Sequence, residues 1–181
     1  QRGYNCSDKP PHKSDYALDI LADDVLGLIE ASGREQVYLI GHDWGGAVAW
    51  YFAAKYPRKL HKMVILNVPH GSVMRRNLRQ NFSQLRKSWY FLFFQIPWLP
   101  EAGARMGNWR SAVNALKNSS RPGTFSEEDF DNYRRAWSRP GAYRSMINWY
   151  RAIMQHPPKD PIPRRITVPT LHIWGAQDKF L

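Results

Sequence analysis

The residues with the most evident chemistry are 41–46, which read Gly-His-Asp-Trp-Gly-Gly. Gly-x-Asp-x-Gly has the spacing of a nucleophile elbow, a tight turn between a strand and a helix, with Asp43 in the place of the usual serine. Such a turn strains its central residue and needs small neighbours, which Gly41, Gly45 and Gly46 supply. An aspartate with its ordinary pKa of ~3.9 is ionised at neutral pH and can attack saturated carbon without an activating base. The alternative role for Asp43 is to cap the helix that follows.

The elements around this turn predict an α/β fold. Residues 37–40 form a short apolar strand before the turn, and residues 47–56 lack helix breakers until Pro57. Further apolar strands are expected at 63–68 and 170–174. Strands separated by helices favour a parallel sheet.

Two further segments of the chain are expected to be helical. Ser14 is expected to cap a helix that runs to Gly33 and buries a stripe containing Leu21 and Ile29. About a hundred residues separate the second strand from the third, far more than a crossover needs, so they must form an insertion. Ser126 and Asp129 match a capping box, which predicts helices in that insertion.

The composition excludes several classes of protein. The 181 residues are 43% hydrophobic and contain a single cysteine, Cys6, which excludes a disordered chain and a disulfide scaffold and favours a reducing, cytoplasmic compartment. No apolar run is long enough to cross a bilayer.

The 26 basic and 15 acidic residues give a net charge of +11, and the stretch from Arg58 to Lys87 contains basic but no acidic residues. A solvated face explains this stretch, and a nucleic-acid-associated domain is the alternative, although no nucleic-acid motif accompanies the charge.

The 41–46 sextet resembles the elbow of epoxide hydrolases, a family of the α/β-hydrolase superfamily, and residues 66–70 resemble the strand that leads into the family's lid. The resemblance implies a partial α/β-hydrolase fold, a parallel sheet with a helical lid inserted. It divides the chain into the first part of the core at 1–69, the lid at 70–163 and the second part of the core at 164–181.

The resemblance also assigns roles to residues beyond the elbow. Residues 88–97 resemble the segment that holds the first lid tyrosine, here Tyr90, and residues 148–151 resemble the segment that holds the second, Tyr150. Both hydroxyls would protonate the oxygen of an opening epoxide, although each tyrosine is also explained as an ordinary core aromatic. Asp178, after the third strand, resembles the acid that orients the catalytic histidine.

The substrate pocket is expected to include His42, Trp44, His70 and Trp149, and the Trp44 amide to contribute to an oxyanion hole. None of the six histidines fits the catalytic base, which in the family lies further along the chain than Asp178. The His-Gly-x-Pro oxyanion loop is expected to precede residue 1. Neither a metal nor an organic cofactor is expected, because the sequence has no H-E-x-x-H, cysteine pair or G-x-G-x-x-G motif.

The predicted function is therefore hydrolysis of a small epoxide to a vicinal diol through an ester on Asp43. The principal alternative is a haloalkane or haloacetate dehalogenase, which uses the same nucleophile and often a tryptophan beside it, as Trp44 is. Two lid tyrosines favour an alkoxide leaving group, because a halide does not need a proton. Nucleic acid is not expected as a partner.

Overall fold

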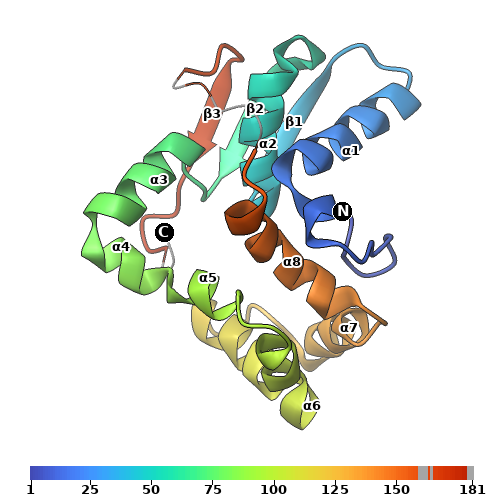
Figure 1. Cartoon of the computed structure of the whole chain (residues 1–181), viewed down its shortest axis with the longest axis vertical. Helices are drawn as coiled ribbons and strands as arrows, with labels where there is room; N and C mark the ends of the chain where they lie inside the picture. The colour runs from blue at the N-terminus through green and yellow to red at the C-terminus, as the bar shows by residue number, and fades with distance from the viewer. Residues whose placement is uncertain (159–162, 164, 179–181) are drawn as a thin grey trace. The chain divides into compact units, whose positions relative to one another are not determined.

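A computed structural model of the chain describes residues 1–158, 163 and 165–178. The chain forms two compact units: Gln1–Tyr16 with Tyr90–His156, hereafter the helical unit, and Ala17–Trp89 with Pro157–Leu181, hereafter the sheet unit. Figure 1 labels the helices and strands of both units.

The sheet unit contains three parallel strands in the order β1-β2-β3. Their bounds are β1 Val37–His42, β2 Leu60–Leu66 and β3 Thr170–Ile173. Within one to three residues these are the expected strands, and the α/β class with a parallel sheet is confirmed. The helices of this unit are α1 Leu18–Ala31, α2 Trp44–Lys55, α3 Gly71–Gln80 and α4 Phe82–Lys87, and Pro57–Lys59 forms a short 3-10 turn.

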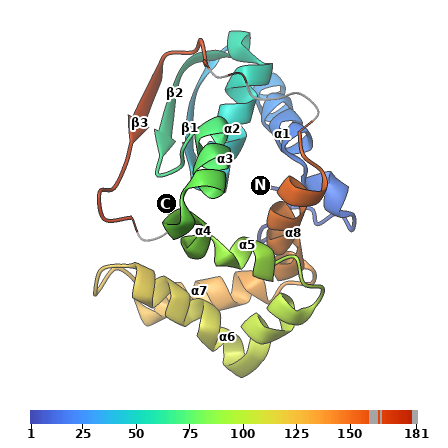
Figure 2. The ribbon, with the colours of Figure 1, turned by 60° about the vertical axis from the view of Figure 1, so that its left-hand side comes forward.

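The two faces of the sheet differ in their cover. Figure 2 shows α1 and α2 on one side of the strands. Met63 and Ile65 of the central strand are both buried and, two positions apart, share one face of it. Residues Ile40, Val64 and Leu171 are aligned across the three strands and point to the other side. Ile40 is 67% exposed and Leu171 57% exposed. In the part of the chain that the structure describes, this apolar face of the sheet is therefore exposed.

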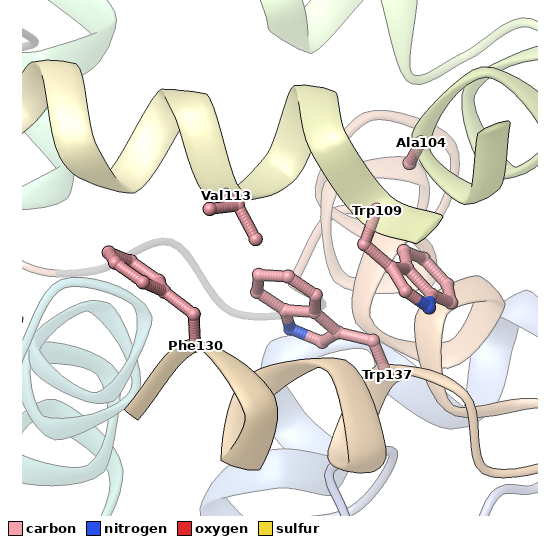
Figure 3. Close-up of a cluster of buried hydrophobic side chains, with 5 residues drawn as sticks. All are labelled: Ala104, Trp109, Val113, Phe130 and Trp137. Atoms are coloured by element: carbon pink, nitrogen blue, oxygen red, sulfur yellow. The ribbon is translucent and has the colours of Figure 1, made fainter. Parts of the chain in front are cut away.

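The helical unit contains α5 Trp89–Phe93, which begins one residue before the unit, α6 Leu99–Ser119, α7 Glu127–Trp137 and α8 Ala142–Gln155. The helical conformation of α6 is interrupted at 106–109, where Gly107 has a φ of 59°. The predicted capping box is confirmed: Ser126 and Asp129 exchange hydrogen bonds at the start of α7. Figure 3 shows the apolar cluster between α6 and α7, formed by Ala104, Trp109, Val113, Phe130 and Trp137.

The first expected helix starts later than predicted. Lys13–Tyr16 is a 3-10 turn, and α1 begins at Leu18 without a side-chain cap, so the assignment of Ser14 as its cap is wrong. The reason is a tertiary contact. The hydroxyl of Tyr16 is 2.8 Å from both the Pro10 carbonyl oxygen and Ser145 Oγ, and this buried contact holds the turn against α8 of the same unit.

Among the described residues, no helix combines the length and the apolar character that a bilayer crossing requires. All regular structure described between β2 and β3 is helical, as expected for the insertion.

Candidate active site

The turn between β1 and α2 holds Asp43 in a conformation rare for residues with a side chain, with φ 51° and ψ −125°. The Asp43 carbonyl accepts hydrogen bonds from the N–H groups of Gly46 at 2.9 Å and Ala47 at 3.0 Å, so its backbone starts the helix. Its side chain is exposed and makes no capping hydrogen bond. The geometry therefore disfavours helix capping as the reason for an aspartate here.

The glycines around Asp43 are required by close packing. A Cβ atom on Gly41 would lie 2.5 Å from the carbonyl oxygen of Gly45 and 2.8 Å from Cα of Gly46, and backbone atoms cannot move aside cheaply. A Cβ on Gly46 would overlap Cγ1 of Val68. The turn thus closes only because both positions lack side chains.

The neighbours of Asp43 differ in burial. Trp44 is half-buried and is the first residue of α2, which puts its N–H at the positive end of the helix dipole. An oxyanion formed on the Asp43 ester would gain from that position. His42, the last residue of β1, has an exposed side chain.

Asp178 follows β3, and its carboxylate is hydrogen-bonded to Asn67, the residue after β2. Nδ2 of Asn67 donates to Oδ2 of Asp178 at 2.5 Å, and Oδ1 of Asn67 accepts from the N–H of Gly175 at 3.2 Å. The backbone N–H of Asn67 donates to the Ile173 carbonyl at 3.0 Å, and Asn67 has a φ of 51°. Asn67 therefore fixes both the loop after β3 and the carboxylate that this loop presents.

His70 lies at the start of α3, where its Nδ1 atom accepts a hydrogen bond from the N–H of Ser72 at 3.3 Å. Its ring contacts the ring of Trp50 edge-on at 5.2 Å. Burial lowers the pKa of His70 below its ordinary value of 6.5, because it disfavours the charged form of the ring. The position of the ring at the start of α3 makes it a helix cap.

Tyr90 and Tyr150 lie together in the helical unit. Their rings meet edge-on, with centroids 5.8 Å apart and an interplanar angle of 76°. Phe91 and Phe94 contact the Tyr150 ring at 5.1 and 4.8 Å. The structure therefore brings the two predicted lid tyrosines into contact, which their separation by 60 positions in the chain did not require.

Trp149 is buried in the same unit. Its indole N–H donates to the Arg2 carbonyl at 3.2 Å, and its ring packs edge-on against Tyr4 at 5.5 Å. These contacts give Trp149 a structural role, joining α8 to the N-terminal loop. Its contact with substrate stays a prediction.

The structure adds two polar residues that the sequence analysis did not identify as candidates. They are Asn67, beside Asp178, and Arg151, a buried arginine on α8. The only signal for Asn67 was a polar residue at the carboxyl end of an apolar strand, where ligands of parallel sheets gather. Within the described part of the chain, no group of three or more histidine, cysteine, aspartate or glutamate side chains is arranged to hold a metal ion.

A strained Asp43 between a parallel strand and a helix, with an acid after a later strand, is the arrangement of an α/β hydrolase. The profile of the alpha/beta hydrolase fold family matches residues 1–181, and the chain belongs to this family.

Within that family the chain is similar to epoxide hydrolases. It is 36% identical over 185 residues to human Epoxide hydrolase 4, covering 99% of this chain and 51% of that protein. It is also 43% identical to the AB hydrolase superfamily protein YfhM of Bacillus subtilis, over all of this chain and 63% of that protein. A crystal structure of the Bacillus megaterium epoxide hydrolase in complex with an inhibitor superposes with a TM-score of 0.86 at 30% identity, over 99% of this chain and 66% of that one. The chain thus spans half to two thirds of the length of these relatives.

Proposed function

We propose that this protein hydrolyses epoxides and that Asp43 is the nucleophile. The conformation of Asp43 carries the proposal: its φ of 51° is strained, and its side chain makes no capping hydrogen bond. Strain of this kind is maintained where function requires a side chain to be presented. The similarity to epoxide hydrolases supports the choice of substrate class.

In the first step the Asp43 carboxylate attacks a ring carbon of the epoxide. A carbon–oxygen ester bond forms, the ring carbon–oxygen bond breaks, and the electron pair leaves on the ring oxygen as an alkoxide. Tyr90 and Tyr150 donate hydrogen bonds to this oxygen, and one of them gives it a proton. A tyrosine suits the task, because its ordinary pKa of ~10 keeps it protonated at neutral pH.

In the second step water hydrolyses the ester. A histidine removes a proton from the water, Asp178 orients that histidine, and the Trp44 amide stabilises the tetrahedral oxyanion. His70 is a poor candidate for this base, because its ring caps α3 and packs on Trp50. We place the base in the part of the fold that the relatives have and this sequence does not span.

The test is covalent labelling of the protein by styrene oxide, stopped with acid before the ester turns over and followed by intact mass spectrometry and peptide mapping. We expect one adduct with the mass of the epoxide on Asp43, and none there in Asp43→Ala. Tyr90→Phe and Tyr150→Phe should each slow the labelling by a factor of ~10² to 10⁴, the range typical of a lost general acid. Labelling that is unchanged in Asp43→Ala would refute the nucleophile assignment.

A dehalogenase is the second candidate, and Trp44 beside Asp43 favours it, because an indole N–H can hold a departing halide. A primary alkyl bromide of similar size distinguishes the two. If the bromide alkylates Asp43 faster than any epoxide and the two phenylalanine variants keep that rate, the dehalogenase function replaces the epoxide hydrolase function.

A further inference from the structure

Helix α5, which carries Tyr90, is too short to hold its own orientation. It has five residues, Trp89–Phe93, and a single helical turn in isolation is unstable in water. The angle and separation of the Tyr90 and Tyr150 rings therefore depend on contacts with the rest of the unit, among them those of the segment that follows α5.

Those contacts converge on the guanidinium group of Arg151, which is next to Tyr150 on α8 and 3% exposed. Nε donates to the Phe94 carbonyl at 2.9 Å, and Nη2 donates to the Ile96 carbonyl at 2.8 Å. Both carbonyls lie just beyond the last residue of α5. Arg151 thus binds the backbone that ends the Tyr90 helix.

The remaining donors of Arg151 reach two other side chains. Nη1 donates to Oε1 of Glu101 at 2.6 Å and to Oδ1 of Asn148 at 3.3 Å, and Nη2 donates to Oε2 of Glu101 at 3.2 Å. Glu101 lies in the first turn of α6. All five N–H groups of the guanidinium are therefore used, which a lysine with three donors at one point cannot reproduce.

Gln95 makes a second connection between the same segments. Its Nε2 atom donates to the carbonyl of Tyr150 at 3.0 Å and to the carbonyl of Phe91 at 3.1 Å. The segment after α5 is therefore bound to α8 at two adjacent residues, at the carbonyl of Tyr150 and at the side chain of Arg151.

We infer that Arg151, with Glu101 as its counter-ion, is a positioning residue that sets the geometry of the Tyr90 and Tyr150 hydroxyls for proton donation to the leaving oxygen. The inference rests on the proposed function for its chemical consequence, but the ring geometry can be tested without it. A buried ion pair that served only stability would affect every reaction of the protein equally. A positioning residue affects only the reaction that needs the proton.

The kinetic test compares two electrophiles on the same nucleophile. Styrene oxide needs a proton on its leaving oxygen, and a primary alkyl bromide does not. In Arg151→Lys we expect alkylation of Asp43 by the epoxide to slow about 100-fold, the effect of a displacement on the order of 1 Å in a reacting geometry. Alkylation by the bromide should keep its rate. In a background that lacks both hydroxyls, Tyr90→Phe with Tyr150→Phe, Arg151→Lys should add little, because the groups through which Arg151 acts are gone.

The controls separate positioning from folding. Glu101→Gln keeps the shape of the counter-ion and should cause a smaller loss in the same direction, which tests the inference even if Arg151→Lys does not fold. Glu127→Gln removes a carboxylate from an exposed ion pair with Lys117 in the same unit and should change neither rate. Equal losses with both electrophiles, or a full further loss in the background that lacks both tyrosine hydroxyls, would overturn the inference.

The structural test does not depend on the reaction. Nuclear Overhauser contacts between the rings of Tyr90 and Tyr150 should be present in the wild-type protein and weakened or lost in Arg151→Lys and Glu101→Gln. Retention of these contacts in both folded variants would overturn the positioning role, whatever the outcome of labelling. Absence of both Asp43 labelling and diol formation with the wild-type protein would instead refute the proposed function.

Discussion

Asp43→Gly should stabilise the protein while it removes the nucleophile. Asp43 adopts φ 51° and ψ −125°, a conformation that costs residues with a Cβ atom roughly 1–3 kcal/mol. Glycine reaches positive φ without that penalty, but it loses about 0.5–1 kcal/mol through the larger entropy of the unfolded chain. Because the Asp43 side chain makes no capping hydrogen bond, its removal leaves no helix donor without a cap. Removal of the carboxylate also loses its interaction with the helix dipole, about 0.3–1 kcal/mol, so the net expectation is a gain of roughly 0.5 kcal/mol in the free energy of unfolding.

Asp43→Ala is the matched control. It removes the same carboxylate, and with it the same interaction with the helix dipole of about 0.3–1 kcal/mol, but it keeps a Cβ atom and therefore the strain. The difference in the free energy of unfolding between the two variants therefore measures the effect of backbone conformation alone. For a chain of this size, a change of about 1 kcal/mol corresponds to a Tm difference of roughly 2–4 °C.

Thermal unfolding followed by circular dichroism, together with urea titration, measures this difference. Both variants should fail to be labelled at residue 43 by styrene oxide, and only Asp43→Gly should unfold at a higher temperature than the wild-type protein. If Asp43→Ala were as stable as Asp43→Gly, the gain would come from the lost charge and not from backbone strain, and the reasoning that makes residue 43 a functional position would fail.

Three further perturbations have expected outcomes. Asn67→Asp places a second carboxylate against Asp178 and should lower the free energy of unfolding by ~1–2 kcal/mol at pH 7. Because mutual repulsion raises one pKa of the pair above the ordinary carboxyl range, stability should recover in urea titrations as the pH falls and the pair takes up its first proton. His70→Asn keeps a capping acceptor for α3 but does not titrate. Because burial lowers the pKa of His70 in the folded state, the unfolded chain binds a proton first as the pH falls below 6.5. The Tm of the wild-type protein should therefore fall in that range, and the Tm of the variant should fall less. Replacing Ile40 and Leu171 by threonine on the open sheet face should raise solubility, measured by light scattering during concentration, with a Tm change of less than a few degrees; more aggregation in the variant would refute that face as its source.

The elbow and the start of α7 were predictable because both depend on residues close together in the sequence. In the six-residue elbow Gly41 meets backbone atoms within five positions, so this part of the turn is determined by local sequence. The contact of Gly46 with the Val68 side chain is not local. The capping box at Ser126 is equally local, and the structure has it as expected. Ser14 shows the limit of such patterns: a good capping residue was overridden because Tyr16 is held by Ser145, 129 positions away.

Arg151 was not predictable for the same reason. On α8 it stands beside the apolar residues of an amphipathic helix, and nothing in its neighbourhood indicates that its side chain is buried. Apart from Asn148 on the same helix, its acceptors are two backbone carbonyls more than 50 positions away and a glutamate in another helix. Backbone carbonyls have no sequence signature, because every residue supplies one.

The sheet explains why the remaining polar residues of the candidate site occur where they do. In a parallel sheet all strands end at the same edge, so the residues that follow neighbouring strands become neighbours whatever their separation in sequence. Asp43 follows β1, Asn67 follows β2, and Asp178 lies five residues beyond β3. The hydrogen bond between Asn67 and Asp178 spans 111 positions, yet it needs only the pairing of Leu66 with Ile173. Polar residues that follow the strands were thus a usable signal for the part of the site that contains Asp43, Asn67 and Asp178. The contact between Tyr90 and Tyr150 depends instead on helix packing, which the order of the strands does not determine.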